Sequence, residues 1–358
     1  MKSVVEEVSK EWALEPEHEF RFEVDFGTTV KLKLISGTAE IYGTEIGIGP
    51  EGICSVEYVA NETPMTSYLN MHLALEQCRE EAKSKDEMGP RVMIVGPEDV
   101  GKTSLSKILL SYAFRQGRQP IFVDLDTNEG SITMPGTLTT TVINQIIDVE
   151  EGFGSSTTTS PSLGSSMIPV AYYYGYSDPG ENVKLYKVLT AKLAQTVKHR
   201  AANDEDAKVS GMVIDTSGDL TSNIFIVNII IVLGHERLYS DMAKLYKEHP
   251  EISVLKLAKS GGARSLAPSS ALPIGIDRKV SETQLVKVEP DDLIRHSILA
   301  LTSSNSADEH ELLETNIIGF IRVSEVDTVK QKMTILTPCP GRLPKQYLIM
   351  GSYKWMES

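Results

Sequence analysis

The stretch Gly96-Pro97-Glu98-Asp99-Val100-Gly101-Lys102-Thr103 decides the fold of this 358-residue chain. It matches the pattern G-x-x-x-x-G-K-[ST], in which the glycines let backbone N–H groups curl around the β-phosphate of a nucleotide. A short apolar run, Arg91 to Val95, precedes it, and a helical pattern from Lys102 to Gly117 follows it. The start of that helix would add the positive end of its dipole to the phosphate site. Motif and context together predict a phosphate-binding loop, or P-loop.

Two residues of the P-loop carry chemistry of their own. The Lys102 ammonium would bridge the β- and γ-phosphates of a nucleotide, and the Thr103 hydroxyl would hold Mg²⁺. A chance strand, turn and helix with these letters is the competing explanation, and the agreement between the motif and its flanking patterns argues against it. Lys102 is therefore a predicted catalytic residue, and Thr103 is a predicted metal ligand.

Acidic residues end two further predicted strands. The run "PIFVDLD" (residues 120–126) places Asp124 and Asp126 two positions apart, so both would project to one face of the strand. Because strand carboxyl ends line the ligand crevice of such a sheet, Asp126 is predicted to activate an attacking hydroxyl or to hold Mg²⁺ through water. An acidic residue that merely starts a turn would give the same letters. The run "VSGMVID" (209–215) offers Asp215 as a second metal ligand.

Two other motifs suggest alternatives that we favour less. Residues 215–218 read D-x-x-G, like the switch of GTPases, but no N-K-x-D motif for reading guanine occurs in the chain. The tyrosine run "YYYGY" (172–176) could stack on bases. Such a run more often forms a half-buried strand, which is the interpretation we prefer.

Short apolar runs alternate with helical patterns between residues 88 and 260. The apolar runs are "RVMIV" (91–95), "PIFVDLD" (120–126), "VSGMVID" (209–215) and "NIIIVLG" (228–234). Short apolar strands separated by helices predict a parallel sheet covered by helices on both faces. Asn228 sits inside the apolar stretch 224–233 and would need a hydrogen-bond partner there.

The two ends of the chain show strand patterns instead. Period-two alternation in 20–26 and 30–35, followed by a glycine-rich stretch, predicts a small N-terminal β domain. A helical pattern from Pro64 then leads to a boundary near Met88. Alternation returns in 296–304, 316–326 and 332–340. The predicted domains are 1–87 (β domain plus connecting helix), 88–265 (P-loop domain) and 266–358 (C-terminal β-rich domain).

Composition excludes several classes of protein. The chain has 35 Lys and Arg against 49 Asp and Glu, a formal net charge of −14. A broad basic surface for nucleic acid is therefore not expected, although a local basic cleft could bind RNA. Three scattered cysteines predict no disulfide framework or zinc site. The longest apolar stretch is about half of the ~20 residues that cross a membrane, so a cytosolic or nuclear protein is expected.

Several blocks together resemble one family over most of the chain. They include "EFRFEV" (19–24), "ETPMTSYLNMHLALEQ" (62–77), "GPRVMIVGPEDVGKTSL" (89–105), "RQPIFVDLDTNEGSITMPGT" (118–137), "VAYYYGYSDPGENVKLYK" (170–187), "KSGG" (259–262) and "TPCPGRLPKQYLI" (337–349). These blocks resemble the corresponding blocks of the Clp family. A member of this family is a pre-mRNA cleavage complex II subunit built on a polynucleotide 5′-hydroxyl-kinase fold. The chain looks like a plant-like, divergent and shortened member.

The resemblance implies an α/β P-loop core between two β domains, in a nuclear protein that binds ATP and Mg²⁺. It implies other pre-mRNA cleavage and polyadenylation factors as partners, with RNA as a candidate and no membrane. Glu19 matches the glutamate that reaches toward the nucleotide base, and Asp126 matches the acid that activates the RNA 5′-hydroxyl. The implied nucleotide-binding set is Glu19, Gly96, Asp99, Val100, Gly101, Lys102, Thr103 and Ser104, and the implied metal set is Thr103, Asp126 and Asp215.

The chain departs from the family pattern where RNA would bind. Active members read "LD-x-G-Q", whereas Asn128 and Glu129 stand here in place of Gly-Gln. The "N-T-x-G-W" clasp, whose Trp stacks on the RNA end base, reads 215–219 here with Asp219 at the Trp position. The Arg-rich lid that follows "KSGG" is missing, and the N-terminal domain is shortened between Gly49 and Val56. The pattern therefore favours an ATP-binding subunit of the 3′-end processing machinery with weak or lost kinase activity, and an active RNA 5′-hydroxyl kinase is the alternative.

Overall fold

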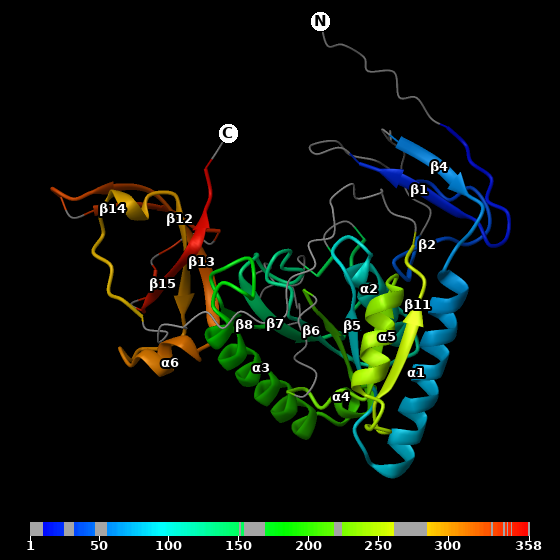
Figure 1. Cartoon of the computed structure of the whole chain (residues 1–358). Helices are drawn as coiled ribbons and strands as arrows, with labels where there is room; N and C mark the ends of the chain where they lie inside the picture. Colours follow the sequence, from blue (N-terminus) through cyan, green and yellow to red (C-terminus); the bar gives the residue numbers. More distant parts are fainter. Residues whose placement is uncertain are drawn as a thin grey trace, which may run out of the picture.

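The computed structural model describes residues 10–24, 32–46, 56–149, 152–153, 169–217, 224–260, 285–330, 332–338, 341, 343–344 and 346–356. A central sheet with helices on both faces lies between a small group of N-terminal strands and a second sheet from the C-terminal part (Figure 1). The predicted fold class, an α/β P-loop core with β-rich flanks, is therefore confirmed.

The central sheet has seven strands in the order β11-β10-β5-β9-β6-β7-β8. The first five in that order are parallel, whereas β7 and β8 pair antiparallel. The loop 125–136 joins β6 to β7 through turns alone, and a parallel connection would need a longer crossover. The bounds are β5 Arg91–Val95, β6 Ile121–Asp124, β7 Thr137–Val142, β8 Val170–Tyr173, β9 Met212–Asp215, β10 Ile229–Leu233 and β11 Ser253–Leu257.

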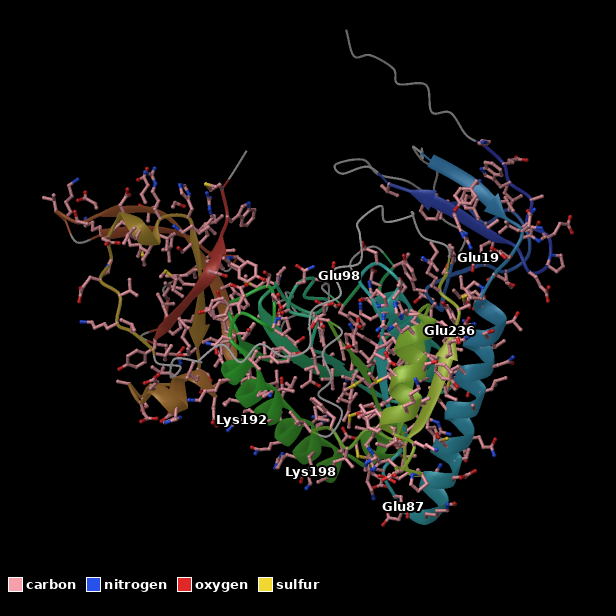
Figure 2. The ribbon with its side chains drawn as sticks, in the orientation of Figure 1. Glu19, Glu87, Glu98, Lys192, Lys198 and Glu236 are labelled. Carbon is pink, nitrogen blue, oxygen red and sulfur yellow. The ribbon has the colours of Figure 1, made fainter. Side chains whose placement is uncertain are left out.

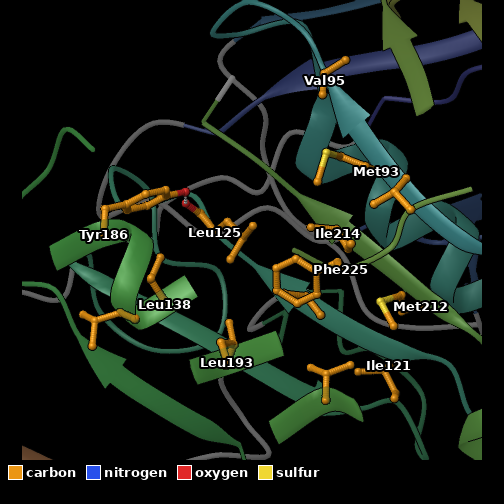
Figure 3. Packing of buried hydrophobic residues seen from close by; sticks show 14 of the residues in the cluster. Met93, Val95, Ile121, Leu125, Leu138, Tyr186, Leu193, Met212, Ile214 and Phe225 are labelled. Atoms are coloured by element: carbon orange, nitrogen blue, oxygen red, sulfur yellow. Dashed lines mark hydrogen bonds between the residues drawn. The ribbon is translucent and has the colours of Figure 1, made fainter. Parts of the chain in front are cut away.

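Helices cover both faces of this sheet because its strands are apolar on both sides. Along β5, Val92 and Ile94 pack with α1 and α2, whereas Met93 and Val95 pack on the side of α3. Figure 3 shows this second cluster, in which the Tyr186 hydroxyl donates a hydrogen bond to the Leu125 carbonyl (3.1 Å). The helices are α1 Met65–Lys85, α2 Lys102–Arg115, α3 Val183–Asn203, α4 Glu205–Ser210 and α5 Glu236–Leu245.

One core strand is shorter than the sequence predicted, and Asn228 beside another has the hydrogen-bond partner that was expected. The strand predicted over 209–215 begins only at Met212, because α4 extends to Ser210 and Gly211 then turns the chain at φ 74°. A Cβ atom on Gly211 would stand 2.1 Å from the Pro90 carbonyl oxygen, so only glycine fits this turn. Asn228 has the partner that it was expected to need, since its Oδ1 accepts a hydrogen bond from the Arg91 backbone N–H (2.8 Å).

The N-terminal part forms four short strands within its described residues, and they differ in part from those predicted. β1 (Glu19–Glu23) pairs antiparallel with β4 (Val56–Ala60), and β2 (Glu40–Ile41) pairs with β3 (Thr44–Glu45) in a short hairpin. The strand predicted over 30–35 is wrong for residues 32–35, the part that the structure describes. Leu32 and Leu34 are half-buried there and Ile35 is 69% exposed, so the alternating side chains are partly covered without forming a strand.

The C-terminal part forms a four-stranded antiparallel sheet in the order β14-β13-β12-β15. Its apolar residues Ala300 and Ile317 pack against Ala171 and Tyr173 of β8, which joins the two sheets. Tyr172 and Tyr173 of the tyrosine run lie in this strand, as preferred from the sequence, and they are buried rather than half-buried. The elements are a 3-10 turn Asp292–Ile294, β12 Ser297–Thr302, α6 Glu309–Leu313, β13 Ile317–Asp327, β14 Lys332–Leu336 and β15 Leu348–Lys354.

The predicted domain limits remain predictions. The limit at 265/266 lies outside the described residues, and α1 ends at Lys85, just before the limit at 87/88. None of the helices in the described part of the chain has the length and apolar character needed to cross a membrane.

A buried arginine ties α1 to the core. Arg79 is 1% exposed, and its guanidinium donates to the Ser210 carbonyl (3.0 Å) and to Glu76 (3.2 Å). Arg79→Met should lower the free energy of unfolding by about 3 kcal/mol, because a broken buried pair leaves Glu76 less compensated. Urea unfolding measures this loss. Arg237→Met is the matched control, since Arg237 is 88% exposed, and equal unfolding midpoints for the two variants would contradict the assignment.

Candidate nucleotide site

The P-loop adopts the strand, turn and helix that its sequence predicts. β5 ends at Val95, the turn passes through Asp99 at φ 57° and Gly101 at φ 88°, and α2 begins at Lys102. A Cβ atom on Gly96 would stand 2.9 Å from the Leu233 carbonyl oxygen, so glycine is required where the loop passes β10. The Lys102 side chain is 6% exposed, and its ammonium donates to the Pro97 carbonyl (2.9 Å) inside the loop. The lysine is thus already folded over the turn.

The remaining residues of the P-loop contribute to its conformation. Val100 is buried in the cluster shared with α1 and α2, which anchors the loop to the core. Ser104 follows Thr103 in the first turn of α2, beside the loop's backbone N–H groups. Glu98 lies near the tip of the loop (Figure 2). Every nucleotide-site residue predicted from the motif therefore lies in the turn or in the first helical turn after it.

Asp215 meets Thr103 at the end of β9. The Thr103 hydroxyl donates a hydrogen bond to Asp215 Oδ2 (2.6 Å), while Asp215 Oδ1 is buried without any hydrogen-bond partner. Burial raises the pKa of Asp215 to about 6, and the Thr103 hydrogen bond and the Lys102 charge act against that rise. Burying a carboxylate oxygen without a hydrogen-bond donor lowers the stability of the folded protein. Such an oxygen is well suited to bind a cation.

Asp124 and Asp126 have different roles, contrary to the expectation that one strand would present both. β6 ends at Asp124, so the loop positions Asp126 instead. Asp124 accepts the backbone N–H groups of Asp126 (3.0 Å) and Ser131 (2.7 Å), and thereby shapes the loop 125–136. Burial and the neighbouring Asp215 raise the pKa of Asp124 to about 8. Asp126 is 7% exposed, and its Oδ1 accepts the Asn128 N–H (2.9 Å).

Glu129 brings a further carboxylate to the same edge of the sheet. Its Oε2 lies 3.4 Å from the Thr103 hydroxyl, within hydrogen-bond distance, and its charge contributes to the raised pKa of Asp215. No group of three or more acidic, histidine or cysteine side chains among the described residues forms a metal site by itself. A cation at Thr103 and Asp215 would therefore need oxygen ligands from a bound phosphate as well.

Glu19 reaches the core from the N-terminal strands. Its carboxylate accepts hydrogen bonds from Arg21 (2.8 Å) and from the Thr63 hydroxyl just before α1. The Ser260 hydroxyl, beyond the end of β11, lies 3.4 Å from the same carboxylate. Figure 2 labels Glu19 where these strands meet the core. The N-terminal part thus contacts the core through Glu19 and its partners, and also through Glu40, which accepts a hydrogen bond from Arg115 of α2 (2.9 Å).

Several residues singled out from the sequence cannot be placed. Asp219 of the altered clasp, the lid segment 261–284 and the shortened stretch up to residue 55 lie outside the described residues. Sequence reasoning in turn missed Thr127, which is fully buried beside Asp126 and is bonded to three separate segments. No local pattern indicates this role, because its partners lie as far as 226 positions away.

Three family profiles match the chain. They are "mRNA cleavage and polyadenylation factor CLP1 P-loop" over residues 96–273, "Pre-mRNA cleavage complex II protein Clp1" over 246–357, and "N-terminal beta-sandwich domain of polyadenylation factor" over 13–51 and 46–82. The chain belongs to the Clp1 family. The resemblance inferred from the sequence blocks is confirmed, and the N-terminal profile matches in two pieces near the stretch that looked shortened.

Curated relatives match over nearly the whole chain. The mRNA cleavage and polyadenylation factor clp1 of Botryotinia fuckeliana is 37% identical over 425 aligned positions, covering 95% of this chain and 92% of the relative. Polyribonucleotide 5′-hydroxyl-kinase Clp1 of Homo sapiens is 33% identical, with 96% of each chain covered. Because 95% of 358 residues is about 340, about 85 of the 425 positions hold no residue of this chain. Segments of the relative are therefore absent here.

Solved structures agree with the fold. A structure of the wild-type Clp1p–Pcf11p (454–563) complex matches with a TM-score of 0.79 at 25% identity, covering 96% of this chain and 99% of that one. A second, described as an extended interface between Pcf11p and Clp1p, matches with a TM-score of 0.78 at 24% identity. The strand order and the flanking β parts thus follow an established fold.

Asp215 should make stability depend on pH. Its pKa of about 6 in the folded protein lies above the value of about 3.9 in an unfolded chain, so the cost of burying its charge is absent below about pH 4 and complete above about pH 6. Wild type should therefore lose up to about 3 kcal/mol relative to Asp215→Asn between these values. Urea unfolding from pH 4 to 7, without nucleotide or Mg²⁺, tests this, with the exposed Asp241→Asn as control. Parallel pH curves for wild type and Asp215→Asn would contradict it.

Proposed function

We propose that this chain is an ATP- and Mg²⁺-binding subunit of the nuclear machinery for pre-mRNA 3′-end cleavage and polyadenylation. The observation that carries the proposal is the intact P-loop with Thr103 bonded to Asp215, whose second carboxylate oxygen is buried and unpartnered. That oxygen fits a divalent cation that also binds the β- and γ-phosphates. Its relatives are named as cleavage and polyadenylation factors, which supports the same role here.

The described residues would share the nucleotide as follows. Lys102 would exchange its contact with the Pro97 carbonyl for the β- and γ-phosphates. The backbone from Gly96 to Ser104 would surround the phosphates, and Thr103 with Asp215 would hold Mg²⁺, with Asp126 acting through water. Glu19 would face the base from the N-terminal side, held by Arg21 and Thr63. Mg²⁺ would neutralise the phosphate charge beside Asp215 and Glu129.

Partners follow from the family rather than from a surface of this chain. A solved relative is described in complex with Pcf11p, and we propose that other cleavage and polyadenylation factors likewise bind this protein. RNA is a further candidate partner. The net charge of −14 favours a local basic site for RNA over a broad binding surface.

An active RNA 5′-hydroxyl kinase is the alternative function. The placement of Asp126 near Asp215 and the P-loop favours it, because a hydroxyl placed there could give its proton to the carboxylate. The kinase name of the relatives favours it as well. Against it stand Asn128 and Glu129 at the Gly-Gln positions of the active pattern, Asp219 at the position of the stacking Trp, and the missing lid arginines.

ATP with Mg²⁺ should raise the melting temperature of the protein, and Lys102→Ala should abolish the rise. A ligand that binds only the folded state stabilises it by RT ln(1 + [L]/Kd), about 2.7 kcal/mol at a hundredfold excess over Kd. Lys83→Ala, an exposed lysine of α1, is the control and should respond like wild type. Equal stabilisation of wild type and Lys102→Ala would contradict the nucleotide site. Because no N-K-x-D motif for reading guanine occurs in the chain, ATP should be preferred over GTP, and GTP shifting the melt as strongly as ATP would contradict this preference.

RNA 5′-phosphorylation should be undetectable or orders of magnitude below that of an intact family kinase. Losing a base-stacking side chain removes ~1–3 kcal/mol of RNA binding, and losing an arginine that neutralises the transferring phosphoryl group costs ~10³–10⁵ in rate. Incubation with γ-labelled ATP and a 5′-hydroxyl oligoribonucleotide measures the transfer. Robust labelling that Asp126→Ala eliminates would instead establish the kinase alternative.

A further inference from the structure

The C-terminal sheet contacts the loop that carries Asp126. Tyr353 of β15 donates a hydrogen bond from its hydroxyl to the Thr127 carbonyl oxygen (3.1 Å). Its ring lies against Gly136 at the other end of the loop, where an added Cβ atom would stand 2.3 Å from the ring. One side chain of the C-terminal part therefore touches both ends of the loop 125–136.

Thr127 is the point at which three segments meet. Its carbonyl oxygen accepts both the Tyr353 hydroxyl and the Gly136 N–H (2.8 Å), and its own hydroxyl donates to the Ser177 carbonyl (2.7 Å). Thr127 directly follows Asp126, whose carboxylate accepts the N–H of Asn128. The position of the Asp126 carboxylate thus depends on the backbone on both sides of Thr127.

β15 approaches this region too closely for any side chain at its centre. A Cβ atom on Gly351 would stand 2.5 Å from Gly175 and 2.7 Å from the Tyr173 hydroxyl. The Ser352 N–H donates to the Gly175 carbonyl (2.8 Å), and the Gly175 N–H donates to the Gly136 carbonyl (2.9 Å). A continuous set of hydrogen bonds therefore runs from β15 to the loop. The approach also explains why Tyr353, two positions along the strand, can reach Thr127.

We propose that Tyr353 is a positioning residue for Asp126, so that the C-terminal β part completes the nucleotide site rather than being a separate attachment. The inference rests on the proposed function, in which Asp126 holds Mg²⁺ through water. Tyr353 itself touches neither nucleotide nor metal and acts only through Thr127. The hydroxyl, rather than the ring, is the group that fixes the loop.

Tyr353→Phe tests this directly in the full-length protein, because it removes the hydroxyl and keeps the ring against Gly136. Amide hydrogen exchange, read by mass spectrometry, should become about fivefold faster in the loop 125–136, the effect expected for one lost hydrogen bond. Exchange in β5 and α2 should not change. Tyr347→Phe is the matched control, since Tyr347 is 40% exposed in the same part of the chain. Loop exchange in Tyr353→Phe equal to that of wild type would overturn the proposal.

The Mg²⁺ requirement separates a positioning role from a merely structural one. The Mg²⁺ concentration that gives half of the ATP-dependent rise in melting temperature should increase several-fold in Tyr353→Phe, with the rise at saturating Mg²⁺ retained. A loosened loop with an unchanged Mg²⁺ requirement would overturn the proposal. Wild type without any ATP response would contradict the proposed function instead, and the exchange measurement would still decide whether Tyr353 holds the loop.

Gly351→Ala gives an independent second test. Its added methyl group would push β15 away from Gly175, so Tyr353 would keep its hydroxyl group but lose its position against Thr127. It should reproduce the faster exchange in loop 125–136 and the raised Mg²⁺ requirement. Faster exchange confined to the C-terminal sheet would contradict the connection through β15.

Discussion

Two neighbouring carboxylates at the carboxyl edge of the central sheet constrain everything built around them. Asp124 and Asp215 are register partners on the parallel strands β6 and β9, and both are at most 1% exposed. Burial, together with the proximity of Asp215, raises the pKa of Asp124 to about 8. Hydrogen-bond donors lower the cost of burying such a pair, although Asp215 Oδ1 has none. The Thr103 hydroxyl donates a hydrogen bond to Asp215, and the backbone N–H groups of Asp126 and Ser131 donate to Asp124.

Those donors come from the segments that would bind the nucleotide, so folding and site formation are one process here. The same edge also receives the two β parts, through Glu19 beside Ser260 on one side and Tyr353 on Thr127 on the other. Glu19 and Tyr353 are the polar side chains that reach this edge, and further contacts, such as Glu40 with Arg115 and Ser352 with Gly175, also hold the two parts to the core. Parts of the chain more than 200 positions apart therefore converge on one crevice, where open α/β sheets generally bind their ligands.

The sequence was sufficient where a feature depends on neighbouring residues and insufficient where it depends on distant ones. The P-loop was predictable because glycine positions, an apolar strand and a helix start are all encoded within about 20 residues. The antiparallel pairing of β7 and β8 was not, because it follows from how the loop 125–136 turns. The position of Asp126 also escaped prediction: strand alternation was extended past Asp124, whereas the structure ends β6 there. No sequence pattern near Thr127 indicates that Tyr353 is its hydrogen-bond partner.

Holding a nucleotide and transferring its phosphoryl group make different demands on this site. Holding requires the turn from Gly96 to Ser104 and the Thr103–Asp215 pair, which are compact and retained. Transfer also requires an acceptor clamped in line with the γ-phosphate, from residues spread over several segments. The altered residues Asn128, Glu129 and Asp219 and the missing lid all fall in that second group. Glu129 adds negative charge within 3.4 Å of the Thr103 hydroxyl, and this charge would repel the phosphates of an RNA acceptor. Under the proposed function, a nucleotide bound there would stabilise the folded protein, at an edge that the Glu19 and Tyr353 contacts also reach.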